Sequence, residues 1–163
     1  MFSMKKLLCI ISAMLLLCFC ASAQEADTFT LWFEEGFSLD LPQGWVSYPT
    51  DASAQLSDIR YILSDSEAQR YMYIMYRPTT FADIAALDSA VAADEAFDKT
   101  GDLVFDGCSF IAFAMPGQDL SGCMTLHDGH LLTFVYSPQS DSEYMMLAAS
   151  IMDTFNCIEQ PAA

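Results

Sequence analysis

Apolar and polar residues follow two different periods along the chain, and the N-terminal third shows the shorter one. A short apolar run over 29–33 and an alternating run over 37–41 each predict a half-buried strand. Pro42 and Gly44 end the second strand, because proline has no N–H to donate and glycine permits a sharp change of direction. Trp45 follows, and we expect it to fold back and fill the end of the core.

The middle of the chain predicts a loop and two further strands. Residues 47–58 are mostly polar, which favours a loop, and residues 60–63 predict a brief strand. Residues 70–77 (RYMYIMYR) are apolar at both odd and even positions, which is typical of a central strand covered on both faces. Large side chains of this kind can line a ligand groove, but at strand spacing we interpret them as core. The side chains concerned are those of Tyr71, Met72, Tyr73, Met75 and Tyr76.

A helical period appears first over residues 79–97. Thr80 and Asp83 have the spacing of a capping box at its start. An apolar stripe recurs every three or four residues, as one buried helix face requires. Its members are Phe81, Ile84, Leu87 and Val91.

A second helix is predicted from Asp141 to about Cys157. Ser140 and Glu143 form the capping-box pattern before it. The apolar stripe of this helix again indicates one buried face. Its members are Tyr144, Leu147, Ala148, Ile151, Phe155 and Ile158.

Four strands are predicted between the two helices. Asp106-Gly107 and Asp128-Gly129 are the dipeptides most typical of tight hairpins, and Pro116-Gly117 breaks the run between them. The predicted strands are 103–105, 108–115, 120–127 and 130–136. Strands, a helix, more strands and a closing helix together indicate an α+β fold, with helices packed on a mainly antiparallel sheet.

This order of elements, together with the segment FSLDLPQGW at 37–45, resembles the Mog1/PsbP-like domains over roughly residues 29–158. The resemblance implies a small α/β/α sandwich of a type that bacteria often export. One branch of that superfamily binds a small GTPase, and another supports photosynthetic water oxidation. The functional residues of neither branch can be matched here, so the resemblance assigns no site residue.

The first 23 residues have the three zones of a secretory signal peptide. Lys5 and Lys6 precede an uncharged apolar run over 7–19, and Ala21-Ser22-Ala23 supplies the small residues that a signal peptidase reads. The run is short for a membrane crossing, which needs about 20 residues. We expect cleavage before Gln24, with residues 24–163 forming a single domain.

Two alternatives to cleavage at this point remain. The apolar run could be retained as a membrane anchor, although polar residues follow it at once. Cys18 or Cys20 could instead carry a lipid, although the preceding Leu17 and Phe19 are bulkier than a lipidation motif prefers.

The chain carries 22 acidic and six basic residues, for a net charge of −16. Cleavage would remove Lys5 and Lys6 and make the balance more negative still. A negative field repels phosphate, which argues against nucleic acid and anionic membrane surfaces as partners. It suits solubility, and it is also compatible with a cationic partner.

Three cysteines would remain after cleavage, at 108, 123 and 157, and each lies among apolar neighbours. An odd number does not make a disulfide scaffold, and we interpret all three as core residues. If Met115 pairs with Leu120, then Cys108 and Cys123 each lie four residues from the other's partner, about 13 Å away. They should therefore not be bonded to each other, whereas Cys157 could still reach one of them.

His127 and His130 are the only histidines, and the Asp128-Gly129 turn would place them opposite each other with Cβ atoms about 5 Å apart. Two ligands make a weak metal site, and we interpret the pair as an exposed hairpin tip. No G-x-S-x-G, CxxC or D-x-D-x-D-G pattern is present. The sequence therefore assigns no catalytic, cofactor or metal residue, and weak divalent binding stays open.

Two functions follow from these observations. The first is an exported noncatalytic domain that binds a protein or an envelope component. The second is a small extracytoplasmic hydrolase or metal-dependent enzyme. A cavity that holds a histidine and a buried carboxylate would favour the enzyme, whereas a groove without them would favour the binding domain.

Overall fold

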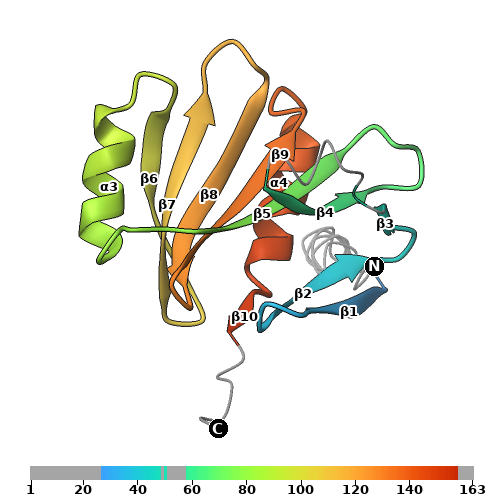
Figure 1. Cartoon of the computed structure of the whole chain (residues 1–163). Helices are drawn as coiled ribbons and strands as arrows, with labels where there is room; N and C mark the ends of the chain where they lie inside the picture. Colours follow the sequence, from blue (N-terminus) through green and yellow to red (C-terminus); the bar gives the residue numbers. More distant parts are fainter. Residues whose placement is uncertain (1–26, 49, 51–57, 158–163) are drawn as a thin grey trace, which may run out of the picture.

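The computed structural model describes residues 27–48, 50 and 58–157, and its dominant element is a seven-stranded antiparallel sheet (Figure 1). The strand order is β3-β4-β5-β9-β8-β7-β6. The strands are β3 (Val46–Tyr48), β4 (Ile59–Ser64), β5 (Tyr71–Pro78), β6 (Asp98–Phe105), β7 (Cys108–Met115), β8 (Leu120–His127) and β9 (His130–Ser137). Strands that follow each other in the sequence are neighbours in the sheet from β3 to β5 and again from β6 to β9. Each such pair is antiparallel and can be joined by a simple hairpin connection.

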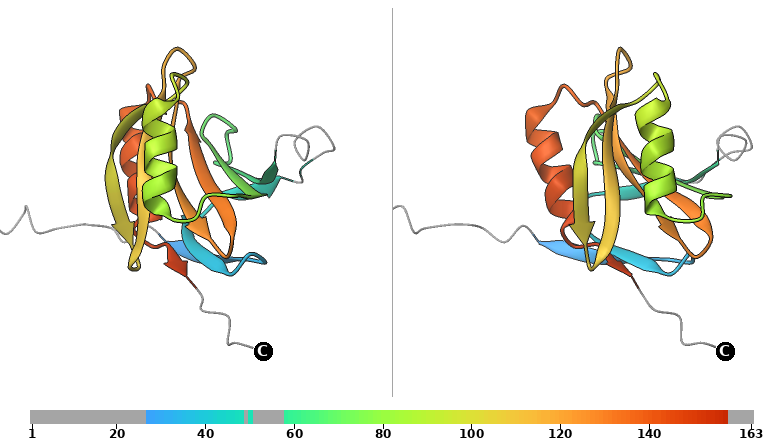
Figure 2. Two further views of the ribbon diagram at one scale, coloured as in Figure 1. Left: turned by 60° about the vertical axis from the view of Figure 1, so that its left-hand side comes forward. Right: turned by 90° about the vertical axis from the view of Figure 1, so that its left-hand side faces the viewer.

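A smaller sheet and two helices complete the described structure. The smaller sheet has the order β1-β2-β10, and its strands are β1 (Thr28–Phe33), β2 (Phe37–Pro42) and β10 (Asn156–Cys157). The helices are α3 (Ile84–Ala93) and α4 (Ser142–Met152), and they lie on opposite faces of the large sheet (Figure 2). The predicted α+β architecture, a sheet with a helical layer on each side, is confirmed.

The α4 face of the sheet, called the closed face below, is covered by two elements and keeps one hollow of about 250 Å³ beside α4. The small sheet and α4 together cover this face. The core between them includes Phe37, Phe134 and Tyr144, which are fully buried. Trp45 belongs to this core and is 7% exposed, with its ring 6.2 Å from that of Tyr144. The expected burial of Trp45 is therefore confirmed.

The strand register follows the turns that the sequence predicts. Met115 pairs with Leu120 and Ala112 pairs with Cys123, so the loop at 116–119 has the predicted four residues. His127 pairs with His130 across the two-residue turn. Both are cases in which the turn residues set the register of the strands that they join.

The α3 face is covered only in part, because of the route that the chain takes. β5 lies between β4 and β9, whereas β6 is the far edge strand, so the connection through α3 crosses the sheet. The helix packs over β6 and β7 at the end of that crossing (Figure 1). The predicted two-sided cover of β5 is wrong on this face: Met72 and Ile74 are buried on the closed side, but Tyr73 and Met75 are only half-buried.

The predicted caps of both helices need correction. Asp83 itself caps α3 by accepting from the Ala86 N–H at 2.8 Å, whereas Thr79, before the predicted Thr80 cap, donates its N–H to Gly129. Segment 79–83 is thus tied to the β8–β9 turn and stays outside the helix. The helix is correspondingly shorter than 79–97, and β6 begins earlier than the predicted 103.

The N-cap of the closing helix lies one residue later than predicted, at Asp141 instead of Ser140. Asp141 is the N-cap of α4 and accepts from the Tyr144 N–H at 2.9 Å. Ser140 instead donates from its N–H and its hydroxyl to the Asp119 carboxylate, at 2.7 and 2.9 Å. The helix ends at Met152, so Cys157 lies in β10 and not at the end of the helix.

The expectations for the signal peptide at 1–23, and for most of the loop at 47–58, lie outside the described residues. Neither described helix is long and apolar enough to cross a bilayer.

Candidate functional site

An open apolar groove lies where the sheet leaves the cover of α3. Its volume is about 290 Å³, near the lower end of the range for ligand pockets, about 300–1,000 Å³. One wall is α3 with its flanking segments, and the floor is formed by β5, β9, β8 and β7. The side chains on the helix wall are Phe81, Leu87, Ala90, Val91, Asp94 and Phe97, and those of the floor are Met75, Arg77, Thr133, Val135, Leu131, Met124, Phe113 and Met115.

A glycine in β8 shapes the floor of the groove. A Cβ atom added at Gly122 would collide with the Phe134 carbonyl oxygen on one side and the Phe113 ring on the other. Because Gly122 has no side chain, the Phe113 ring can approach its backbone closely. The same ring meets that of Phe97 edge-on, with centroids 5.1 Å apart. This aromatic pair joins the floor to the segment that leaves α3.

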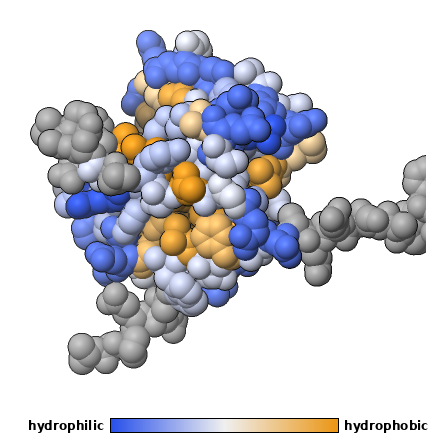
Figure 3. Space-filling model, turned by 90° about the vertical axis from the view of Figure 1, so that its right-hand side faces the viewer, coloured by the Kyte–Doolittle hydropathy of each residue, from blue (hydrophilic) through white to orange (hydrophobic). Residues whose placement is uncertain are grey.

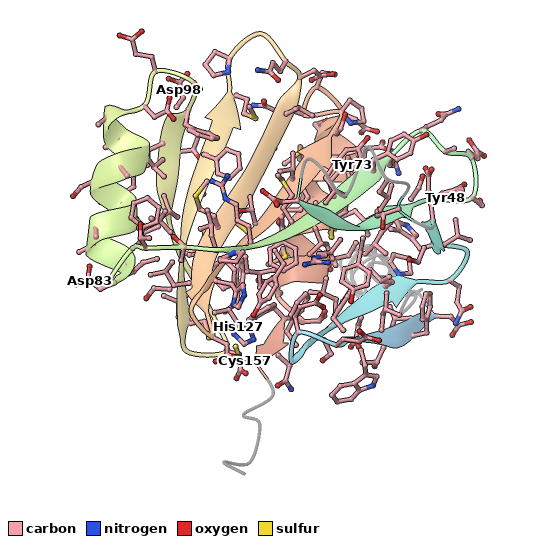
Figure 4. The ribbon with its side chains drawn as sticks, viewed as in Figure 1. Tyr48, Tyr73, Asp83, Asp98, His127 and Cys157 are labelled. Carbon is pink, nitrogen blue, oxygen red and sulfur yellow. The ribbon has the colours of Figure 1, made fainter. Side chains whose placement is uncertain are left out.

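The lining of the groove carries one cation, Arg77, and one acid, Asp94, and further acids lie near α3. Arg77 is exposed and makes no salt bridge with any residue in the described ranges. Exposed carboxylates lie at both ends of α3, and Figure 4 labels the first and the last of them. These acids are Asp83, Asp94, Glu95 and Asp98. The surface at both ends of α3 is therefore acidic, and the floor beside the helix is apolar.

Aromatic surface continues from the groove toward the opposite edge of the sheet. Paired positions place Val135, Tyr73, Ile62 and Tyr48 in one row across β9, β5, β4 and β3. Tyr73 stacks on Tyr71 with ring centroids 5.9 Å apart. The pKa of Tyr73 is raised, mainly by burial and to a smaller extent by the neighbouring Tyr71. Tyr48 is 41% exposed, so the row ends in solvent.

Apolar surface is also visible from the edge where this row ends. Figure 3 shows that apolar side chains gather there in a patch between polar ones. The strand β3 lies at this end of the molecule (Figure 1), and its Val46 is 42% exposed. Apolar surface of this kind on a chain with so many charges is typical of a contact region.

The two histidines do not converge on a common ligand. The Nε2 atom of His127 is hydrogen-bonded to the Glu35 carbonyl oxygen in the β1–β2 turn, at 2.8 Å. The His130 ring stacks on Tyr76 at 4.3 Å, and its Nδ1 bonds to the Asp128 carbonyl oxygen. Asp128 and Gly129 form an exposed hairpin tip, as predicted, whereas the two histidines beside it are half-buried.

The three cysteines have two different environments. Cys123 is 2% exposed beside the Tyr136 hydroxyl, and burial raises the pKa of its thiol to about 12, which makes it inert. Cys108 and Cys157 are only half-buried, and their sulfur atoms lie 3.2 Å apart. The prediction of three core thiols thus holds for Cys123 alone.

The cavities lack the combination that would favour an enzyme. A second cavity of about 250 Å³ lies between α4 and the sheet, and neither it nor the groove is lined by a histidine. Within the described residues, no group of three or more His, Cys, Asp and Glu side chains is placed to hold a metal ion. The lining of the groove is therefore apolar apart from Arg77, Asp94 and Thr133.

Comparison with known proteins supports the fold alone. No protein-family model matches the chain, and no curated protein sequence matches it. The solution structure of cyanobacterial PsbP (CyanoP) from Synechocystis sp. PCC 6803 is similar, with a TM-score of 0.56 and 12% sequence identity. The match covers 85% of this chain and 96% of that one, so the fold is PsbP-like, as the sequence resemblance implied.

Only one feature of the amino-acid sequence pointed to the groove. The strand 70–77 was apolar on both faces, yet one helix before β6 cannot cover a face this wide. Because one helix cannot cover the whole face, Tyr73 and Met75 could have been expected to remain partly exposed. No sequence pattern indicated that Arg77, Phe97 and Phe113 line the groove.

Proposed function

We propose that this chain is an exported, noncatalytic domain that binds a protein through the groove beside α3. The observation that carries the proposal is an apolar floor left open beside the helix, with no histidine in its lining. Apolar surface at the centre of a contact, within a polar rim, is the usual anatomy of a protein interface.

The charge of the chain indicates the chemistry of the partner. Acids at both ends of α3 flank the groove, and the whole chain has a net charge of −16. Such a field speeds the approach of positively charged partners and slows that of negative ones. We therefore expect a protein segment with apolar side chains that enter the groove and with lysine or arginine on either side.

The proposed site of action is outside the cytoplasm. The pattern of Lys5, Lys6, the apolar run and Ala21-Ser22-Ala23 supports it. Intact-mass measurement on protein recovered after export should give a chain that begins at Gln24. A retained Met1, or a lipid on Cys18 or Cys20, would contradict this part of the proposal.

The binding proposal is tested with a displayed library of random peptides selected on the purified protein. The groove variant is Met75→Glu, which places a charge on the apolar floor. The matched control is Met146→Glu, because Met146 is a methionine of α4, on the other side of the sheet, and is 69% exposed. A charge there changes the net charge equally but leaves the groove intact.

The expected peptides combine apolar with basic residues. Their affinity should fall by at least about tenfold with Met75→Glu, and by less than about twofold with Met146→Glu. Peptides that bind both variants equally would show that the groove is not the contact surface. Selected peptides rich in acidic residues would contradict the proposed partner chemistry.

A further inference from the structure

Two cysteines that are 49 positions apart in the sequence meet at one end of the sandwich. The Cys108 and Cys157 sulfur atoms are 3.2 Å apart. Cys108 is the first residue of β7, directly after the Asp106-Gly107 turn, and Cys157 lies in the short strand β10. Figure 4 labels Cys157 beside His127 at this end of the sheet.

Backbone contacts hold Cys157 in place from two directions. Its N–H donates to the Asp106 carboxylate at 3.0 Å, in the same turn that leads into Cys108. It also pairs with Phe37 of β2, which is fully buried. The two thiols are therefore brought together by the fold, and not by a chance overlap of mobile side chains.

We propose that Cys108 and Cys157 form a disulfide when the folded protein meets a thiol–disulfide oxidant. A bonded pair of sulfurs is about 2.05 Å apart, so closure requires a movement of only about 1 Å. Both residues are half-buried, which leaves a route for the oxidant. Cys123 is excluded, because it is 2% exposed and its sulfur contacts the Tyr136 hydroxyl at 3.3 Å.

His127 is placed to take the proton from Cys157. A carbonyl oxygen can only accept, so the hydrogen bond to Glu35 puts the proton of the neutral ring on Nε2. Nδ1 is then an acceptor, and it lies 3.6 Å from the Cys157 sulfur. Burial, together with the contact to Cys108, raises the pKa of Cys157, so a base is needed to form its thiolate.

The reaction is two thiol–disulfide exchanges. The Cys157 thiolate, formed by proton transfer to His127, attacks one sulfur of oxidised glutathione, and the displaced glutathione thiolate recovers that proton. The Cys108 thiolate, whose proton has gone to water, then attacks the Cys157 sulfur and displaces the second glutathione thiolate, which is protonated in turn. Two protein thiols are oxidised, and one oxidised glutathione becomes two reduced ones.

The bridge would tie the last described strand to the large sheet. β10 is only two residues long and has one neighbour, β2, in the small sheet. A covalent link across 49 positions restricts the unfolded chain and leaves the folded one almost unchanged. The melting temperature of the oxidised protein should therefore be roughly 10 °C higher than that of the reduced protein.

The test is nonreducing peptide mapping of the full chain after incubation with oxidised glutathione. It uses no binding partner, so its outcome is independent of the proposed function. Among the three cysteines of the described residues, we expect one linked pair, Cys108 with Cys157, and a free thiol at Cys123. Cys123→Ser should leave the link intact, and Cys108→Ser should stop at a glutathione adduct on Cys157.

Other outcomes would overturn the inference. A folded protein that yields no linked pair after exhaustive oxidation excludes the bridge, as does a link that includes Cys123. His127→Leu should still reach the same link but about tenfold more slowly, because the proton acceptor is lost. An unchanged rate in that variant would remove the role assigned to His127.

Discussion

The two faces of the seven-stranded sheet are built from similar residues but are covered differently. The α4 face is closed by a helix and by the small sheet, and its core includes Phe37, Leu39, Phe134 and Tyr144, which are fully buried. The α3 face is covered by one helix at one end, and beyond it Met75 and Tyr73 are half-buried. The two faces therefore differ in how fully their side chains are buried: those of the α4 face stabilise the fold, whereas part of the α3 face remains accessible to a partner.

The route of the chain is what leaves the α3 face open. The segment after β5 must reach the far edge of the sheet before β6 can pair with β7, so its helix is carried away from β5. The apolar side chains of β5 on this face, Tyr73 and Met75, are then left only half-buried. If the two faces differ in stability as they do in structure, substitutions on the closed face should cost more than substitutions in the groove.

The largest effect is expected on the closed face. Trp45→Ala should lower the free energy of unfolding by about 3–5 kcal/mol, because it leaves a large cavity against Tyr144. Urea unfolding followed by tyrosine and far-UV signals would measure it. A change below about 1 kcal/mol would show that the closed face is not the main source of stability.

A smaller loss is expected where the floor of the groove is tightest. Gly122→Ala should cost about 1–3 kcal/mol, because the new methyl group collides with the Phe134 backbone and the Phe113 ring. Gly101→Ala is the matched control, because an added Cβ there has no neighbour within 4 Å. Equal melting temperatures for the two variants would contradict the close approach of the strands at Gly122.

The closed face also predicts a weakness at high pH. Burial raises the pKa of Tyr136 well above the ordinary value of 10.0, with the nearby Cys123 as a further cause. Because the folded pKa is the higher one, this contribution to stability is complete below about pH 10 and is lost as the pH rises above it. Melting temperatures from pH 8 to pH 12 should fall less steeply for Tyr136→Phe, and an identical slope would show that Tyr136 ionises freely in the folded protein.

The smallest effect on stability is expected in the groove. Met75→Ser should change the free energy of unfolding by less than about 1 kcal/mol, since the side chain is already half-exposed. Its loss should instead appear as weaker binding of the selected peptides. If the melting temperature fell as far as that of Trp45→Ala, the two faces would not be distinct.

Much of the sheet could be predicted from local residues. Asp106-Gly107 and Asp128-Gly129 set two hairpins, and the loop after Met115 set the register that places Cys123 opposite Ala112. These signals act over a few residues, where turn geometry decides the pairing. Trp45 was predicted to be buried for a similar reason, since a proline and a glycine turn the chain just before it.

The position of α3 and the helix ends needed tertiary information. Thr80 was expected to cap the helix, but the Thr79 N–H bonds to Gly129 of a distant turn and keeps this segment out of the helix. Ser140 likewise does not cap α4, because its N–H bonds to the Asp119 carboxylate. Long-range hydrogen bonds of this kind leave no periodic trace in the sequence, and neither does the contact of Cys108 with Cys157.

The binding face is identified most directly by the backbone amide shifts that change when a peptide selected on the wild-type protein is added to isotope-labelled protein. The changes should gather around the groove, at Met75, Thr133, Val135 and Phe97. The amides of Met146 and its neighbours in α4 should stay unchanged. Shifts centred on α4, or on the edge strand β6, would contradict the claim that the open face beside α3 is the binding surface.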